Sequence, residues 1–298
     1  RDLVTFPRRV VWSRGPGCAE LAAILATGSA HQVEANPVQA CIDHRADLAV
    51  MRSLGSFDLV PLAVPAELDV SAVSQVLAAV STGPHSELTA AVAVRLGSSL
   101  EVPARASTVV RPGAARGTAR ARLTEIRSAT GLDGDVVEAK AAADLVSSLA
   151  EGTLIVLGAP GGSWLTRQFF GPGARLRAHA PAGTIVVRDA PARVFQHLVD
   201  VTGIGVHTRV ADVLELTTTP TVPITEGGRL LGIVRRSTLQ EIEPGREVGE
   251  VIEEPPYVVA EDDLDSLGEL SDFYEHGPIP VVDRRGVLIG MLPADALA

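Results

Sequence analysis

An apolar run at 153–157 leads into a segment rich in glycine and proline, and a second apolar run follows at 184–187. Glycines placed directly after a buried strand let backbone N–H groups approach a phosphate, and the next helix directs its positive end at the same anion. The segment therefore predicts an anion-binding turn in a parallel α/β sheet. Its candidate ligand-contacting glycines are Gly158, Gly161, Gly162, Gly171 and Gly173.

Residues 73–190 alternate apolar runs with helical patterns, which is typical of a parallel α/β sheet. We expect a five-stranded parallel sheet here, with Gly97 as the C′ residue of its first helix. Ser81, Val80 and Val109, at the predicted strand ends, are candidate contacts to a ligand. The predicted strands lie near 75–81, 101–110, 135–139, 153–158 and 184–188, and the helices near 85–97, 114–128, 141–150 and 165–180.

Residues 191–298 contain a duplicated unit. Pro223 and Pro280 are 57 residues apart, and Gly232 and Gly290 are 58 apart. A period of this length indicates a supersecondary unit that buries its apolar face against its copy. We expect an α+β pair with copies at 192–242 and 246–298. Each has a helix before a β-hairpin, at Val210 to Leu216 and at Leu264 to Phe273.

Residues 1–72 form a small α/β segment of uncertain fold. Strands are predicted at 9–12 and 58–64, a short helix at 18–26 and a longer helix at 38–54. The sequence Ser13-Arg14-Gly15-Pro16 is echoed 68 residues later by Ser81-Thr82-Gly83-Pro84. The echo either reflects how common Gly-Pro turns are or marks a truncated second α/β lobe that packs on the next domain.

Composition narrows the class of protein. A net charge of −10 argues against nucleic-acid binding, which needs a basic surface. The two cysteines and seven histidines lack metal-ligand spacing, so we expect no metal site. Two cysteines also do not make a disulfide framework, and we expect a cytoplasmic protein. No nucleophile-elbow or P-loop pattern is present, and we expect no enzyme activity.

Residues 73–190 resemble the universal stress protein domain. The resemblance rests on the strand and helix start at 76–87, the segment from Leu157 through Gly171, and the closing strand at 184–187. It implies a site for ATP or a related adenine nucleotide. The chain has Pro172 where that family has Ser or Thr, and Ser81 where it has Asp.

Residues 191–298 resemble a tandem CBS-domain pair, or Bateman module, through the Val-Pro and apolar-Gly-apolar patterns of both copies. The resemblance implies binding of AMP, ATP, S-adenosylmethionine or cyclic di-AMP between the copies and regulation of an attached or partner enzyme or transporter. Arg235 and Arg236 follow the first copy's glycine strand. They are candidate phosphate ligands, and the alternative is a solvated turn beside the acidic stretch at 241–254.

Two functions follow as hypotheses. The first is a non-catalytic cytoplasmic sensor that binds an adenine nucleotide, forms a homodimer and signals by rearranging its domains. The alternative is a dimerising regulatory scaffold that is the cytosolic tail or companion of a membrane transporter, such as a cation/proton antiporter. The substitutions at Pro172 and Ser81, and a first residue Arg1 rather than Met, favour the alternative.

Overall fold

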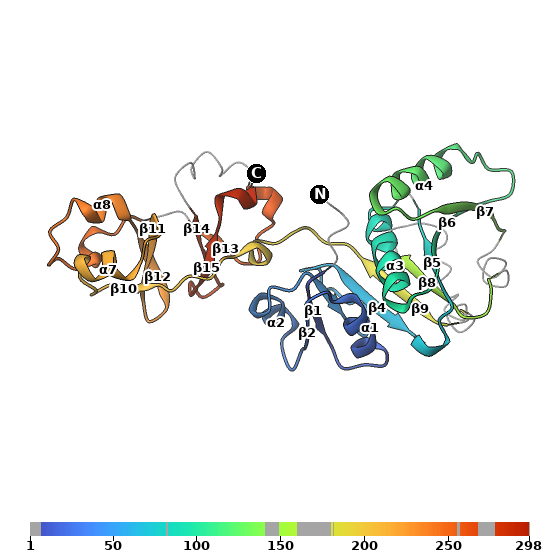
Figure 1. Cartoon of the computed structure of the whole chain (residues 1–298), viewed down its shortest axis with the longest axis horizontal. Helices are drawn as coiled ribbons and strands as arrows, with labels where there is room; N and C mark the ends of the chain where they lie inside the picture. The colour runs from blue at the N-terminus through green and yellow to red at the C-terminus, as the bar shows by residue number, and fades with distance from the viewer. Residues whose placement is uncertain are drawn as a thin grey trace. The chain divides into compact units, whose positions relative to one another are not determined.

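The computed structural model divides the chain into two compact units, residues 1–190 and residues 191–298 (Figure 1). None of the helices in the described part of the chain has the length and hydropathy needed to cross a membrane. The structure describes residues 7–81, 83–140, 149–159, 180, 182–254, 257–267 and 278–297.

The first unit is built on one nine-stranded sheet with the order β2-β1-β3-β4-β9-β8-β5-β6-β7. All five strands predicted within 73–190 are present, but they form part of a larger sheet than expected because residues 9–66 add four more strands. The strands are β1 (Arg9–Trp12), β2 (Ser29–Gln32), β3 (Leu48–Val50), β4 (Leu62–Ala66), β5 (Gln75–Ala79), β6 (Ala104–Val110), β7 (Gly134–Glu138), β8 (Thr153–Gly158) and β9 (Thr184–Arg188).

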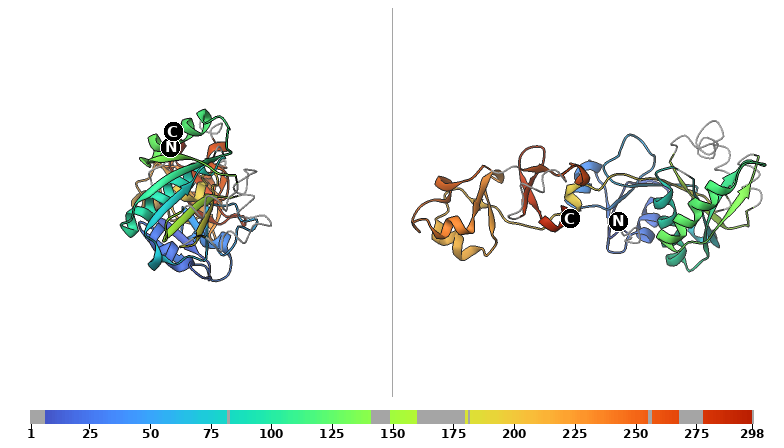
Figure 2. Two further views of the ribbon diagram at one scale, coloured as in Figure 1. Left: turned by 90° about the vertical axis from the view of Figure 1, so that its right-hand side faces the viewer. Right: turned by 90° about the horizontal axis from the view of Figure 1, so that it is seen from above.

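The sheet consists of two sets of parallel strands, which meet edge to edge at one antiparallel pair. Every neighbouring pair is parallel except β4 and β9, which are antiparallel with Val64 opposite Val186. In one set β1 lies between β2 and β3, and in the other β5 lies between β6 and β8. The two sets therefore share a topology around their central strands, and Figure 2 shows the twist of the whole sheet.

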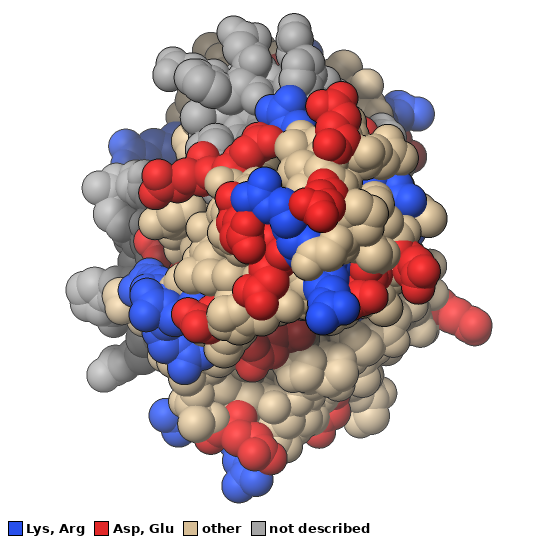
Figure 3. Space-filling view, turned by 90° about the vertical axis from the view of Figure 1, so that its left-hand side faces the viewer, with Lys and Arg blue, Asp and Glu red and all other residues tan. Residues whose placement is uncertain are grey.

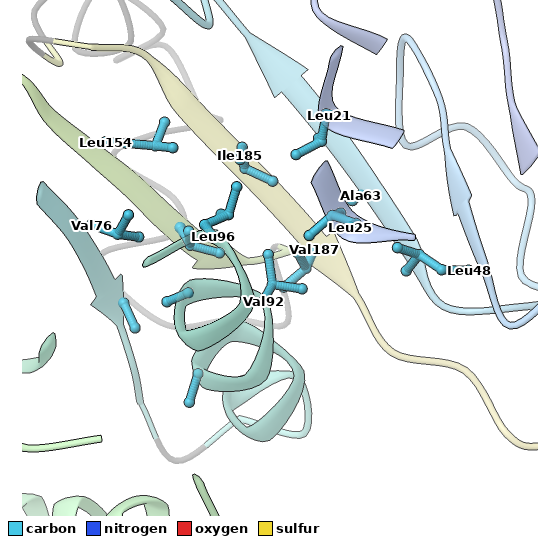
Figure 4. Close-up of a cluster of buried hydrophobic side chains, with 14 of the residues drawn as sticks. Leu21, Leu25, Leu48, Ala63, Val76, Val92, Leu96, Leu154, Ile185 and Val187 are labelled. Carbon is cyan, nitrogen blue, oxygen red and sulfur yellow. The ribbon is translucent and has the colours of Figure 1, made fainter. Parts of the chain in front are cut away.

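Helices α1 (Cys18–Leu25), α3 (Ser86–Leu100) and α4 (Gly117–Thr130) contribute to one apolar core with the sheet. Side chains from both strand sets meet in it. Leu21 of α1 and Leu96 of α3 lie over β4 and β9 with Ile185 between them (Figure 4). Helix α2 (Pro37–Asp43) contacts β1, and its buried Cys41 lies outside this cluster. The shared core makes residues 7–190 one folding unit.

Two expectations about helices were wrong. The helix predicted over 38–54 ends at Asp43, where Arg45 adopts a left-handed φ of 48°, and Leu48–Val50 form strand β3. The apolar triplet pairs with β1 and β4, so tertiary pairing overrides the helical pattern. Gly97 is not a C′ residue, because α3 continues to Leu100 and Glu101 takes the left-handed position.

Some predicted elements lie outside the described residues. These are most of the helix near 141–150, nearly all of the helix near 165–180, and the second half of the helix at Leu264 to Phe273.

The second unit contains two three-stranded sheets of the same design. In each, a short strand runs parallel to the first strand of a β-hairpin, and each hairpin has a register shift, at Ile224/Thr225 and at Val281/Val282. The duplication that the sequence predicts is therefore present in the backbone. The elements are η3 (Val194–His197), β10 (Ile204–Gly205), α7 (Val210–Leu216), β11 (Thr221–Glu226), β12 (Arg229–Arg235), α8 (Arg236–Gln240), η4 (Val248–Val251), β13 (Val258–Val259), β14 (Ile279–Val282), β15 (Leu288–Leu292) and η6 (Ala294–Leu297).

The segment that leads each copy packs on the other copy. Val199 bridges to Met291 of β15, and Glu253 bridges to Ile233 of β12. This exchange of leading segments explains why each copy has a glycine at the same position, Gly232 in the first and Gly290 in the second. A Cβ at Gly232 would lie 2.0 Å from Cγ2 of Ile252, and one at Gly290 would lie 2.9 Å from the carbonyl oxygen of Val199.

Candidate functional site

The candidate ligand site lies at the carboxyl edge of β5 and β8. The chain leaves β5 toward β6 on one side and reaches β8 on the other, and such a reversal opens a crevice outside the strand ends. Gly158 ends β8, and a Cβ there would lie 3.0 Å from the Cβ of His85. The glycine thus lets the start of α3 approach the end of β8.

Ser81 is held in place by its neighbours. Its N–H donates to Oγ of Ser86 (3.0 Å), and the same hydroxyl donates to the carbonyl oxygen of Ser81 (2.6 Å). Nε of Arg122 also donates to that carbonyl oxygen (3.3 Å), and the N–H of Gly83 donates to Oγ of Ser81 (3.2 Å). Ser81 is therefore held by hydrogen bonds to its neighbours, with a guanidinium beside its carbonyl oxygen.

Arg122 has only 16% of its side chain exposed. Its Nη1 lies 2.9 Å from Oε2 of Glu125 and 3.6 Å from Oε1 of Glu87, so its charge is largely neutralised on the far side from Ser81. The guanidinium holds the carbonyl oxygen of Ser81 at this edge, and the carboxylates of Glu87 and Glu125 reduce the positive potential that it adds.

His85, the residue before α3, is half-buried at the same edge. Its Nδ1 accepts a hydrogen bond from the backbone N–H of Asp189 at 3.0 Å, which fixes the neutral tautomer with the proton on Nε2. Burial lowers the pKa of His85; the charge of Arg188 lowers it further and that of Asp189 opposes the shift. His85 thus carries one N–H donor, on Nε2, at the strand edge.

The other predicted contacts of this site fall in different places. Val80 is 2% exposed and belongs to the core, whereas Val109 is half-buried in β6, where it pairs with Val137 of β7. Gly161, Gly162, Gly171 and Gly173 lie outside the described residues, as does Pro172.

Arg235 and Arg236, in the second unit, already have partners within the protein. Nε of Arg235 lies 3.5 Å from Oε2 of Glu253. The guanidinium of Arg236 donates to the carbonyl oxygens of Thr217 and Leu214, the latter at 3.2 Å, and so covers the C-terminal end of α7. The two guanidinium groups are therefore not equivalent. The face in Figure 3 carries acidic and basic side chains side by side.

The described residues contain no group of three or more His, Cys, Asp or Glu side chains arranged to hold a metal ion. Cys18 and Cys41 are free and buried, and burial raises the pKa of Cys41 to about 12. Its thiol is therefore protonated at neutral pH and a poor nucleophile.

Sequence reasoning missed two connections at the β5/β8 edge. One is the contact between His85 and Asp189, which are 104 residues apart, and the other is the role of Arg122. Both depend on strand order, which residue patterns do not report. The hydroxyl of Ser86 just after the Gly-Pro turn was the available signal, since such residues favour positions that bond nearby backbone groups.

Comparison with known proteins gives partial structural matches. No protein-family model matches the chain, and no curated protein sequence matches it. Solved structures that resemble part of it are CBS-domain pairs. One is the CBS pair of a putative Mg²⁺ transporter from Shewanella oneidensis, at 20% identity over 35% of this chain and 67% of that chain, with a TM-score of 0.33.

Two further matches are crystal structures with a nucleotide bound. One is the cytosolic domain of a Mg²⁺ channel in complex with ATP, at 19% identity over 45% of this chain and 60% of that one, with a TM-score of 0.34. The other is CBSX2 in complex with AMP, at 21% identity over 35% of this chain and 92% of that chain, with a TM-score of 0.30. The chain spans less than two thirds of the length of the channel domain.

Proposed function

We propose that this chain is a non-catalytic regulatory protein that binds an adenine nucleotide at the carboxyl edge of β5 and β8. The observation that carries the proposal is the reversal of the chain between these strands, with Ser81, His85 and Gly158 gathered at that edge. Ligands of open α/β sheets bind at such a point. The resemblance of residues 73–190 to the universal stress protein domain supports the same assignment.

The edge offers groups that suit a phosphate. Helix α3 has 15 residues and no side-chain cap at its N-terminus, so its positive end is available to an anion. Nε2 of His85 is a neutral donor, and the guanidinium of Arg122 lies behind the turn. The hydroxyl of Ser81 accepts from a backbone N–H, and no base activates it among the described residues. We therefore assign binding rather than catalysis.

The proposed signal passes through Asp189, whose backbone N–H donates to His85 and which lies two residues before Pro191, the first residue of the second unit. A ligand that contacts His85 can favour one arrangement of the residues around Asp189 over another, and its differential affinity sets the size of the shift. The duplicated second unit is the proposed receiver, and it is also a candidate second site for AMP, ATP or cyclic di-AMP.

Titration calorimetry of the full chain with ATP, AMP and cyclic di-AMP tests this function. We expect heat and a raised melting temperature with at least one of them, and weaker binding in Gly158→Ala, whose new Cβ would press on His85. The matched control is Gly117→Ala, where a Cβ would meet no atom within 4 Å. No heat and no thermal shift with any nucleotide would overturn the proposal.

A regulatory scaffold is the second candidate, favoured by apolar side chains exposed on the second unit. Leu216, at the end of α7, is 68% exposed, and Tyr257 is 60% exposed. Such groups suit a contact with a second copy or with a membrane transporter in the cytoplasm. Light scattering at protein concentrations of tens of micromolar should then show a dimer, and Leu216→Glu should weaken it. If the unmodified chain and the variant are both monomers, this candidate is refuted.

A further inference from the structure

The first 72 residues contain a second strand arrangement of the kind described for β5 and β8. The chain leaves β1 through α1 to β2 on one side, and β3 pairs with β1 on the other, all in parallel. The carboxyl edge of β1 and β3 is therefore also a point where the connections reverse and where a crevice is expected. The echo of Ser13-Arg14-Gly15-Pro16 in Ser81-Thr82-Gly83-Pro84 lies at these two edges.

Two arginines lie at the β1/β3 edge without a carboxylate at ion-pair distance among the described residues. Arg14 follows β1 and Arg52 follows β3, both are exposed, and neither forms an ion pair within the part of the chain that the structure describes. A Cβ at Gly15 would lie 2.8 Å from Cγ of Arg52, so the stem of Arg52 rests on the turn between β1 and α1. In a chain with a net charge of −10, two neighbouring arginines without ion pairs favour an anion site.

The side chain of Arg14 is oriented by β2. With the amide of Gln32 turned so that its oxygen faces Arg14, that oxygen accepts from Nε (2.6 Å) and Nη2 (3.2 Å). This contact leaves Nη1 of Arg14 without a partner among the described residues. The guanidinium is thus held beside Gln32 of β2, and one of its nitrogens stays available to a ligand.

The start of α1 adds backbone donors to the edge. Gly17 is its N-cap residue, with a left-handed φ of 70° and no side chain to cap the helix. The N–H groups of Ala19 and Glu20 have no acceptor among the described residues, and an anion at this end would satisfy them. Oγ of Ser13 is buried next to the Cys18 thiol.

We propose that the β1/β3 edge is a second ligand site, which binds a small molecule through a phosphate or diphosphate group held by Arg14, Arg52 and the N-terminus of α1. One group opposes it: the carboxylate of Glu20 lies in the first turn of α1. The site is separate from the β5/β8 edge and does not depend on the function proposed there.

Calorimetric titration of the full chain with inorganic pyrophosphate at low salt tests the proposal. The double variant Arg14→Gln/Arg52→Gln should bind at least about tenfold more weakly, because two charge-assisted contacts are lost. Both side chains are exposed, so this variant should fold, and its melting curve checks that. The control Arg105→Gln, an exposed arginine of β6, should bind like the unmodified chain.

Two further variants assign the location. Glu20→Gln removes the opposing charge and should tighten binding, and unchanged or weaker binding would argue against a site at the start of α1. Gly158→Ala should leave pyrophosphate binding at the β1/β3 edge intact. The proposal is overturned if pyrophosphate does not bind, if the double arginine variant binds it equally well, or if only Gly158→Ala abolishes binding.

Discussion

The imidazole Nδ1 of His85 accepts a hydrogen bond from the backbone N–H of Asp189 at 3.0 Å. The bond joins the residue before α3 to the residue that follows β9 by one position, near the end of the first unit. The bond exists only while Nδ1 keeps its lone pair, so the protonation state of His85 decides whether this hydrogen bond forms.

The first prediction concerns pH. Burial lowers the pKa of His85 below its usual value of 6.5, so the folded chain favours the neutral ring. Its contribution to stability is complete above pH 6.5 and is lost as pH falls through the lower folded-state pKa. We expect the free energy of unfolding, measured in urea between pH 7.5 and 5, to fall by about 1 kcal/mol more than in His85→Asn.

Asparagine suits this comparison because its Oδ1 can occupy the place of Nδ1 and accept from Asp189 without titrating. His31, whose pKa is lowered, and His207, whose pKa is raised, titrate in both proteins, so the difference isolates His85. Superimposable pH profiles of the two proteins would show that the hydrogen bond does not control stability.

The second prediction concerns Gly97, inside α3. A Cβ there would lie 2.8 Å from the Cβ of Ala104 and 3.1 Å from the carbonyl oxygen of Val102. Gly97→Ala should therefore lower the free energy of unfolding by about 1–3 kcal/mol, less the gain in helix propensity. Gly117→Ala, with open space around it, should be neutral or stabilising by up to about 1 kcal/mol. Equal effects would contradict the close approach.

The sequence predicts most of the elements that have a local signal. Strands β1, β5, β8 and β9 are apolar runs bounded by turn residues, and the helix at Val210–Leu216 has the bounds that its pattern predicts. The duplication in the second unit is visible because its prolines and glycines keep their spacing. These features depend on short-range chemistry, which residue patterns record.

Features that depend on long-range pairing could not be predicted. Strand β2, Ser29–Gln32, has no apolar run and exists because it pairs with β1. The antiparallel contact of β4 and β9 merges two parallel sets, and it is a meeting of strands about 120 residues apart in sequence. At the β5/β8 edge the sequence indicates Gly158 and Ser81, but not His85 as the partner of Asp189.

The third prediction separates the two neighbouring arginines of the second unit. Arg236 donates to the carbonyl oxygens of Thr217 and Leu214 at the end of α7, so Arg236→Ala should lower the free energy of unfolding by about 1.5–3 kcal/mol. Among the described residues Arg235 makes only a half-exposed ion pair with Glu253. Arg235→Ala should therefore lower the free energy of unfolding by less than about 1 kcal/mol.

Urea unfolding of both variants provides the measurement, and calorimetry with ATP provides the contrast. If Arg236→Ala weakened nucleotide binding without lowering stability, the guanidinium would be a ligand contact rather than a cap for α7.

The last prediction follows from the exchange of leading segments. Phe195 belongs to the first copy by sequence, but its N–H donates to the carbonyl oxygen of Ala260 (3.1 Å), and its side chain is fully buried. Phe195→Ala should lower the free energy of unfolding by about 3–5 kcal/mol. Tyr257→Ala changes a side chain that is 60% exposed, so it should lower the free energy of unfolding far less than Phe195→Ala.

Hydrogen exchange followed by mass spectrometry then shows which copy is loosened. The contacts of η3 predict that Phe195→Ala reduces protection mainly in the second sheet, at 258–267 and 278–292, and leaves β11 and β12 of the first sheet protected. Copies that fold within the sequence boundaries 192–242 and 246–298 would show the opposite pattern. Because the glycines at 232 and 290 admit the crossing segments, the same loss should result from Gly290→Val, whose side chain would meet the carbonyl of Val199.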